Sequence, residues 1–291
     1  MEVRAMSRLL QGPGRVVRAM LDDLVTTFYP TDCRACGRPV LRAGLAPVCD
    51  ACVAGIQAQS MTLCGCCGEA LDMEGVRYAG QFPAEGLLCS GCRMAPPEFE
   101  RAVAHAVYED ELREMIHLLK YERMAAVAKP LGRLLARAIE TLEAEAGREL
   151  MVAAVPLFPS KERERGYNQA VLLADVALAE LKKTRPAWKL YAAHGIIRRV
   201  KDTRSQFELT PKGRRRNLQG AFAVAKDAAF AGREILLVDD IYTTGATARA
   251  CARVLRRAGA GRVWVATVSR AQREMVASWD VSSETAIWDA G

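Results

Sequence analysis

The residues of this chain best suited to chemistry are two carboxylates followed by a threonine-rich turn. An apolar stretch, residues 235–238, leads into this group, and a run of helical character follows it. The group consists of Asp239, Asp240, Thr243, Thr244, Gly245, Ala246 and Thr247. Where a helix begins, backbone N–H groups and the positive end of the helix dipole face one point that suits an anion. Because carboxylates accept hydrogen bonds from a vicinal diol, the stretch predicts a sugar-phosphate site.

Helix capping is the plainer interpretation of the same residues, because aspartate and threonine are common at helix starts. We favour the ligand site because acids, turn and helix follow an apolar strand in the order that such a site requires. The stretch resembles the phosphoribosyl-pyrophosphate (PRPP) motif of type I phosphoribosyltransferases. That resemblance implies that Asp239 and Asp240 hold the ribose hydroxyls while residues 243–247 hold the 5-phosphate. If transfer takes place, the two aspartates are the candidate catalytic residues.

Eight of the ten cysteines form four C-x-x-C pairs: Cys33/Cys36, Cys49/Cys52, Cys64/Cys67 and Cys89/Cys92. Two such turns complete a closed site with four cysteine ligands, which is typical of structural zinc. Disulfides suit a cytosolic chain poorly, and a thioredoxin-like redox motif needs only one pair. We therefore expect two structural Zn²⁺ ions, held by neighbouring rather than interleaved pairs. Cys66 and Cys251 are left over, and we expect Cys251 to be a packed apolar residue.

Basic residues gather in two segments that suit anionic partners. The first follows an expected strand at residues 151–156, and its cations Lys161, Arg163 and Arg165 predict a loop for pyrophosphate, with a plain structural loop as the alternative. The second, within residues 198–216, is either a solvated loop or a flap that closes over pyrophosphate or binds nucleic acid. Its candidate residues are Arg198, Arg199, Lys201, Arg204, Arg214, Arg215 and Arg216. Aromatic residues available for stacking on bases are Phe158, Tyr167, Phe207 and Tyr242.

The composition of the 291-residue chain, 51% hydrophobic and 26% charged, is that of a globular protein. Because the chain lacks an apolar run of about 18 residues and a secretory signal, we expect no transmembrane segment and a cytoplasmic location. The formal net charge of +7 arises after residue 97, since acidic and basic residues balance before it.

Strand and helix patterns alternate from residue 98 onward, which predicts an α/β domain whose parallel sheet binds ligands at the carboxyl ends of its strands. We expect an amphipathic helix in residues 1–29, a double zinc-ribbon module in 30–97, a phosphoribosyltransferase-like domain in 98–275 and a tail in 276–291. Expected strands cover residues 101–108, 151–156, 195–197, 221–225, 235–238 and 262–268. Expected helices cover residues 111–121, 129–142, 168–181 and 246–257.

These features together resemble the ComF (ComFC-like) family, whose members join a zinc ribbon to a type I phosphoribosyltransferase domain. The matching stretches are the cysteine pairs and residues 116–121, 164–169, 203–206, 216–222 and 238–247. The resemblance implies PRPP as ligand and zinc at the eight paired cysteines. It also implies a role in natural competence, with single-stranded DNA and the DNA-uptake machinery as partners.

Two other functions stay open from the sequence. One is an active phosphoribosyltransferase of nucleotide salvage or synthesis, which transfers ribose 5-phosphate from PRPP to an unidentified base. Such a transfer needs no protein nucleophile, because positioning and charge stabilisation around a Mg²⁺-bound pyrophosphate carry it. The other is a non-catalytic scaffold or regulator that uses the zinc ribbons and does not bind PRPP.

Overall fold

The computed structural model describes residues 31–40, 47–71, 86–202, 218, 220–226 and 228–272. They form two compact units. One contains the described residues up to Ile56 together with Asp110–Val127, and the other contains Gln57–Glu109 and the described residues from Ala128 onward. The expected N-terminal helix and C-terminal tail lie outside the described residues. The four-part division of the chain drawn from the sequence stays a prediction.

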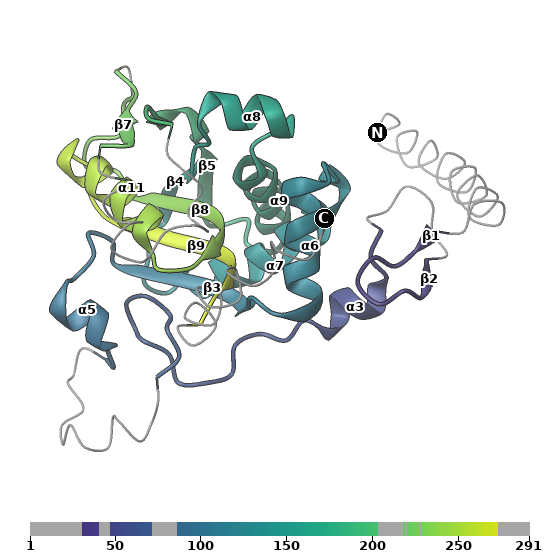
Figure 1. Cartoon of the computed structure of the whole chain (residues 1–291). Coiled ribbons are helices and arrows are strands. Elements are labelled where there is room, and N and C mark those ends of the chain that lie inside the picture. Colours follow the sequence, from purple (N-terminus) through teal and green to yellow (C-terminus); the bar gives the residue numbers. More distant parts are fainter. Residues whose placement is uncertain are drawn as a thin grey trace, which may run out of the picture. The chain divides into compact units, whose positions relative to one another are not determined.

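The larger unit is built on a five-stranded sheet in which every neighbouring pair is parallel (Figure 1). Its strands, in spatial order, are β3 (Arg101–Val107), β9 (Val263–Arg270), β8 (Ile235–Tyr242), β4 (Glu149–Ala154) and β5 (Lys189–Ala192). Every residue of β9 is buried, as expected for a strand that is covered on both faces of a parallel sheet. The expected α/β fold class with a parallel sheet is confirmed.

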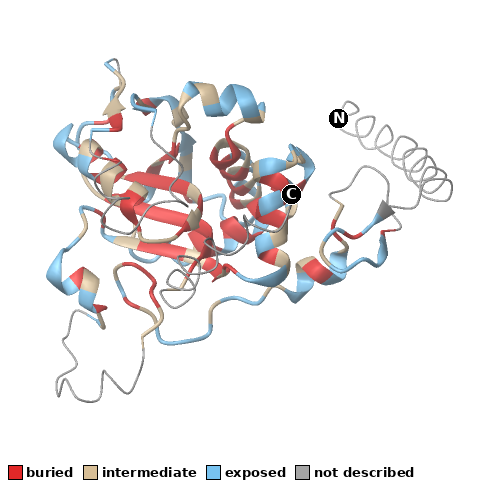
Figure 2. Cartoon of the chain, in the orientation of Figure 1, coloured by how far each residue is buried: buried red, intermediate tan, exposed pale blue. Residues whose placement is uncertain are grey.

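Helices cover both faces of this sheet, so the strands appear as a buried layer in Figure 2. Helices α7 (Ala128–Glu140) and α9 (Gln169–Thr184) lie on one face, and α11 (Ala246–Arg257) lies on the other (Figure 1). Because side chains alternate along a strand, Ile235 and Leu237 of β8 point toward α11 and pack in its cluster. A Cβ added to Gly132 would lie 2.5 Å from Cβ of Val176, so this glycine lets α7 and α9 approach closely.

Several segments differ from the sequence-based expectation. The segment after β4 was expected to be a loop, but it contains the short helix α8 (Pro159–Arg165), which begins with a proline and ends at Gly166 with a φ of 85°. Strand β8 continues through both aspartates to Tyr242 rather than ending at residue 238. The strand expected at 195–197 begins as the 3₁₀ helix η2 (His194–Ile196) and continues as β6 (Ile197–Arg199), which pairs with β7 (Phe222–Val224). Edge strand β5 was not expected.

Glu234, which directly precedes β8, makes a group of hydrogen bonds at the amino-terminal edge of the sheet. Its carboxylate accepts hydrogen bonds from Arg262 at 2.6 Å, from the Trp264 indole at 2.8 Å and from the backbone N–H of Gly147 at 3.1 Å. Although burial opposes ionisation, these donors lower the pKa of Glu234.

In its described residues, the smaller unit contains a cysteine-rich turn, two α-helices and a 3₁₀ helix. Its elements are β1 (Thr31–Asp32), β2 (Pro39–Val40), α3 (Asp50–Gly55), α6 (Asp110–Tyr121) and η1 (Ala125–Val127). An exposed ion pair of 2.9 Å joins Arg34 in the cysteine turn to Glu122 at the end of α6. Within the described residues, no helix is long and apolar enough to cross a membrane.

Candidate anion site and metal centres

The turn after β8, residues 243–245, lies at the carboxyl edge of the sheet and leads into the 12-residue helix α11. Gly245 is the N-cap residue and has a left-handed backbone with a φ of 72°, which glycine adopts without strain. The Thr244 hydroxyl accepts a hydrogen bond of 3.4 Å from the backbone N–H of Ala246. The turn therefore has the strand–loop–helix context that an anion site requires.

Asp239 and Asp240 are the fifth and sixth residues of the eight-residue strand β8, directly before the turn. Asp240 is buried and Asp239 is partly exposed. The Asp239 carboxylate accepts a hydrogen bond of 2.9 Å from the backbone N–H of Asp240. The structure thus brings the acidic pair and the turn of the predicted site to one end of one strand.

Tyr242 lies beneath this turn and is 5% exposed. A Cβ added to Gly245 would lie only 2.1 Å from the Tyr242 hydroxyl, so the tyrosine fills the space under the turn. Burial raises the pKa of Tyr242. This residue is therefore unsuited to stacking on a base, and the expectation that it is available for that role is corrected.

The cations expected to hold pyrophosphate lie on α8, which follows β4, the strand next to β8 in the sheet. Lys161 makes an exposed ion pair of 3.4 Å with Glu164, and Arg165 donates to Gln169. The Asn168 side chain caps α9, because its Oδ1 accepts a hydrogen bond of 2.9 Å from the backbone N–H of Ala170. Its Nδ2 donates a hydrogen bond of 3.0 Å to the carbonyl of Val155. The position of α8 at the same sheet edge as the turn agrees with an anion-binding role, which stays a prediction.

Only part of the basic run lies in the described residues. Arg198 is exposed, whereas Arg199 is partly buried on β6, with its guanidinium carbon 5.7 Å from the Phe222 ring centroid. Burial lowers the pKa of Arg199, and nearby ionisable groups, among them Asp239, partly oppose this effect. Arg204, Arg214, Arg215 and Arg216 lie outside the described residues.

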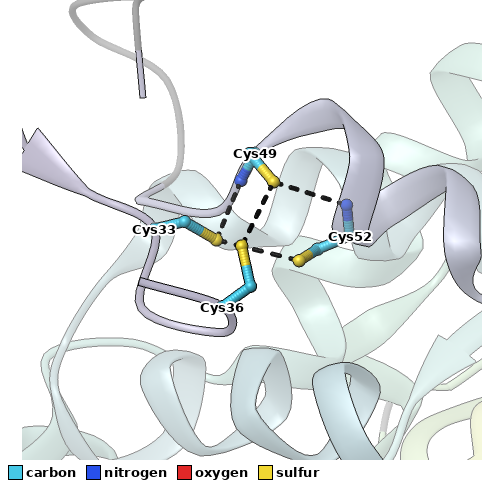
Figure 3. A group of neighbouring side chains, drawn as sticks. All are labelled: Cys33, Cys36, Cys49 and Cys52. Atoms are coloured by element: carbon cyan, nitrogen blue, oxygen red, sulfur yellow. Dashed lines mark hydrogen bonds between the residues drawn. The ribbon is translucent and has the colours of Figure 1, made fainter. Parts of the chain in front are cut away.

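The first cysteine cluster consists of Cys33, Cys36, Cys49 and Cys52 (Figure 3). Its sulfur atoms are 3.9 Å apart for Cys33 and Cys52 and 3.7 Å apart for Cys36 and Cys49. Backbone N–H groups of Cys49 and Cys52 donate to cluster sulfurs at 3.2 and 3.5 Å. A hydrogen bond from the Arg38 side chain helps lower the pKa of Cys36 to about 6.

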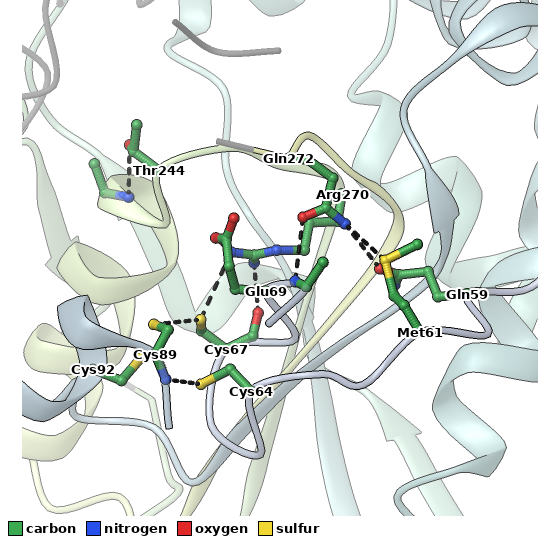
Figure 4. Close-up of polar contacts among 12 residues, drawn as sticks. Gln59, Met61, Cys64, Cys67, Glu69, Cys89, Cys92, Thr244, Arg270 and Gln272 are labelled. Atoms are coloured by element: carbon green, nitrogen blue, oxygen red, sulfur yellow. Dashed lines mark hydrogen bonds and ion pairs between the residues drawn. The ribbon is translucent and has the colours of Figure 1, made fainter. Parts of the chain in front are cut away.

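The second cysteine cluster consists of Cys64, Cys67, Cys89 and Cys92, all of them buried (Figure 4). The sulfurs of Cys67 and Cys89 are 3.7 Å apart, and the backbone N–H of Cys89 donates to the Cys64 sulfur at 3.3 Å. The neighbouring thiol of Cys64 raises the pKa of Cys67 to about 12, and contacts with Cys64, Cys66 and Cys67 raise that of Cys92. Four thiols this close give up their protons together only when a cation compensates their charge.

Both clusters fit zinc by their geometry. Tetrahedral coordination with Zn–S bonds of about 2.3 Å places the sulfurs about 3.8 Å apart, and the three measured separations are 3.7 to 3.9 Å. All ten cysteines are free thiols rather than disulfides. The expected grouping of neighbouring pairs into two four-cysteine sites that can hold structural zinc is confirmed.

The second cluster is part of the core of the larger unit, which the sequence did not indicate. Its four cysteines pack with residues of β8 and α11 in one hydrophobic cluster. The side chain of Arg270 donates to the Cys67 carbonyl and forms an ion pair with Glu69, and both partners of this pair are buried (Figure 4). Cys251 of α11 is fully buried, as expected. Sequence reasoning missed Arg249 and Arg270 because their partners lie far away in the chain.

The fold and the two clusters define a parallel α/β protein with two four-cysteine sites suited to zinc. Comparison with known proteins shows that this chain belongs to the ComF family. It is 32% identical over 240 residues to DNA utilization protein YhgH of Escherichia coli O157:H7, covering 81% of this chain and 95% of that protein. It is 31% identical over 218 residues to Competence protein F of Haemophilus influenzae, covering 74% of this chain and 87% of that protein.

A shorter match, 33% identity over 112 residues, joins this chain to Competence protein ComFC of Bacillus subtilis and covers 38% of this chain and 40% of that protein. No family model matches the chain. The crystal structure of TT1426 from Thermus thermophilus aligns with 52% of this chain and with 88% of the TT1426 chain, at 19% identity. The TM-score of this alignment is 0.28, which is too low to support a conclusion about this protein.

Proposed function

We propose that this protein binds PRPP at the turn after β8 and acts in the uptake and use of transforming single-stranded DNA. The observation that carries the PRPP assignment is the position of the acidic pair and the glycine-capped turn at one strand end, directly before a long helix. The relatives named for competence and for DNA utilization support the second part.

Each part of the proposed site has a separate role toward PRPP. Asp239 and Asp240 accept hydrogen bonds from the ribose hydroxyls, and the backbone N–H groups of the turn hold the 5-phosphate. The cations of α8 face the pyrophosphate from the neighbouring strand end, where arginine suits phosphate oxygens. Mg²⁺ bound with the pyrophosphate would neutralise part of its charge.

Calorimetry with PRPP and Mg²⁺ tests the ligand. Wild type should bind PRPP, and Asp239→Asn/Asp240→Asn should lose at least about tenfold in affinity, since charged hydrogen bonds contribute about 1.5–3 kcal/mol each. The control is the double variant Glu149→Gln/Glu180→Gln, which changes an exposed carboxylate of β4 that pairs with Arg233 and a partly exposed one of α9 that pairs with Lys183. It should bind PRPP as wild type does. Absence of binding by wild type would rule out the proposed ligand.

The same samples distinguish binding from transfer. Under this proposal, PRPP binds without rapid release of pyrophosphate when a panel of nucleobases is added. Rapid release with one base would instead assign the protein as a phosphoribosyltransferase of nucleotide metabolism.

The DNA part is tested by the salt dependence of binding to a single-stranded oligonucleotide. Replacing Arg214, Arg215 and Arg216 by alanine should reduce the slope of log affinity against log salt by about 2, at about 0.7 per lost phosphate contact. The control replaces Lys182, Lys183 and Arg185, a cationic group at the end of α9, and should leave the slope unchanged. An unchanged slope after replacement of these three arginines would show that they do not contact the DNA.

A further inference from the structure

We propose that the second cysteine cluster sets the shape of the anion-binding turn, and that Arg270 and Arg249 are the positioning residues through which it does so. Metal binding at this cluster and anion binding at the turn are then coupled. The identity of the anion as PRPP rests on the proposed function, but the coupling itself rests on contacts within the larger unit.

The first connection runs through Arg270 to the residue beneath the turn. Arg270 is the register partner of Tyr242 across the β8–β9 pair, and its guanidinium carbon lies 4.4 Å from the Tyr242 ring centroid. The same guanidinium donates to the Cys67 carbonyl and lies 3.7 Å from the Cys67 sulfur. One buried cation therefore contacts both a metal-ligand residue and the tyrosine under the turn.

Tyr242 passes this constraint to the turn because there is no free space between them. The separation of 2.1 Å between the Tyr242 hydroxyl and a Cβ built on Gly245 shows that only a glycine backbone fits there. A shift of the tyrosine ring therefore moves the turn or opens a gap beneath it, since packed interiors do not deform continuously.

The second connection runs through Arg249, which lies in the first turn of α11. Its guanidinium donates to the carbonyl of Ala95 at 2.6 Å and to the sulfur of Cys92 at 3.8 Å. Its backbone N–H donates to the carbonyl of Gly245 at 2.9 Å. Arg249 thus joins the fourth cysteine of the cluster to the N-cap residue of the anion-binding turn.

The two connections lie on opposite sides of the turn in sequence, before it at Tyr242 and after it at Arg249. Cys67 and Cys92, the residues they reach, belong to different C-x-x-C pairs of one cluster. A metal ion that holds these pairs together therefore also holds the two ends of the turn at a constant separation. Loss of the ion frees each pair, and the turn loses support on both sides.

The first cysteine cluster provides an internal comparison, because it belongs to the other compact unit. The contacts of its sulfurs in the described residues are with its own cysteines and with Arg38. Loss of metal there is not expected to reach the turn through any of these contacts.

Amide hydrogen exchange on the ligand-free full chain tests the coupling without any assumption about the ligand. In Arg249→Gln, amides of residues 242–249 should exchange faster than in wild type while zinc content stays at the wild-type value. Arg253→Gln, one helical turn further along α11, is the matched control, because Arg253 makes an exposed pair with Glu98. Cys67→Ser should show the same acceleration, and Cys36→Ser should not.

Unchanged exchange in Arg249→Gln, or equal acceleration in Arg253→Gln or Cys36→Ser, would overturn the coupling. If Cys67→Ser does not fold, the two arginine variants still decide. Arg249→Lys, which keeps the positive charge and one donor for the Ala95 carbonyl, should restore part of the protection. If the loss of one positive charge on α11 were the cause, Arg249→Gln and Arg253→Gln would accelerate amide exchange equally.

Zinc affinity provides the reciprocal measurement, because two coupled sites change one another's equilibrium binding affinity by the same factor. In Cys36→Ser, whose remaining zinc is at the second cluster, saturating PRPP should raise the affinity for zinc, measured at equilibrium by competition with a chromogenic chelator, by about fivefold or more. In Arg249→Gln/Cys36→Ser, PRPP should have less effect. If wild type binds PRPP but PRPP leaves the zinc affinity of the second cluster unchanged, the coupling fails while the proposed function stands. If wild type binds no PRPP, the proposed function fails and the exchange data decide the coupling.

Discussion

Arg270 at the end of β9 and Glu69 between the two C-x-x-C pairs of the second cluster form an ion pair whose side chains are only 3% and 8% exposed. The two residues are 201 positions apart in the chain. This pair joins the cysteine-rich segment to the central sheet at the residue that also stacks on Tyr242.

Arg270→Met should therefore destabilise the protein by about 3–5 kcal/mol, because it leaves the Glu69 carboxylate buried without its cation. The measurement is denaturant unfolding of zinc-loaded protein. Arg253→Met, which breaks the exposed pair with Glu98, should cost at most about 1 kcal/mol. Arg270→Met/Glu69→Leu should cost less than Arg270→Met alone. Equal costs for the Arg270 and Arg253 variants would contradict this account.

Acid should destabilise the larger unit partly through Glu234. Its pKa is lowered in the folded state, so its stabilising effect is present above its ordinary value of 4.5 and is lost as the pH falls through the folded pKa. Glu234→Gln should reduce stability by about 1–2 kcal/mol near neutral pH, less at lower pH. Urea unfolding from about pH 7 to about pH 3 measures this. Glu149→Gln, from an exposed pair with Arg233, should show little change across that range.

Gly245→Ala should weaken anion binding and cost about 1–2 kcal/mol, because alanine is strained at a φ of 72°. The added Cβ would also meet the Tyr242 ring. PRPP calorimetry and thermal unfolding check both effects. Gly195→Ala is the control, since a Cβ there meets no atom within 4 Å. If Gly245→Ala binds PRPP with the affinity of wild type, the turn is not part of the PRPP site.

Gly132→Ala should destabilise the α7–α9 contact by about 1–3 kcal/mol, even though alanine favours helix by up to about 1 kcal/mol. The new methyl group would lie 2.5 Å from Cβ of Val176. Gly55→Ala in α3, where a Cβ has open space, should be neutral or stabilising. A stabilised Gly132→Ala, measured by thermal unfolding, would show that the two helices can separate without cost.

Freshly purified protein should contain two zinc ions per chain by metal analysis, one for each four-cysteine cluster. Cys36→Ser should contain one, and strong chelators should lower the unfolding temperature, because metal binding at such sites stabilises the folded state. A content well below two in unchelated wild type would argue against one of the sites.

Local patterns in the sequence determined much of what was predicted correctly. The C-x-x-C turns place two thiols together within a few residues, so the cysteine clusters followed from spacing alone. Helix α11 was predicted with its observed bounds, residues 246–257, because a glycine-capped turn after an apolar strand marks its start. Alternating strand and helix patterns likewise predicted the parallel sheet.

Only the tertiary structure decided which of these pieces support one another. The second cluster packs in the core against β8 and α11, and the first cluster lies in another compact unit. The structure also shows that Arg270 stacks on Tyr242 and that Arg249 bridges Cys92 and Gly245. Arg249 and Cys92 are 157 positions apart in the chain, and Arg270 and Cys67 are 203 positions apart. Strand pairing and burial bring them together, and no local periodicity or propensity carries that information.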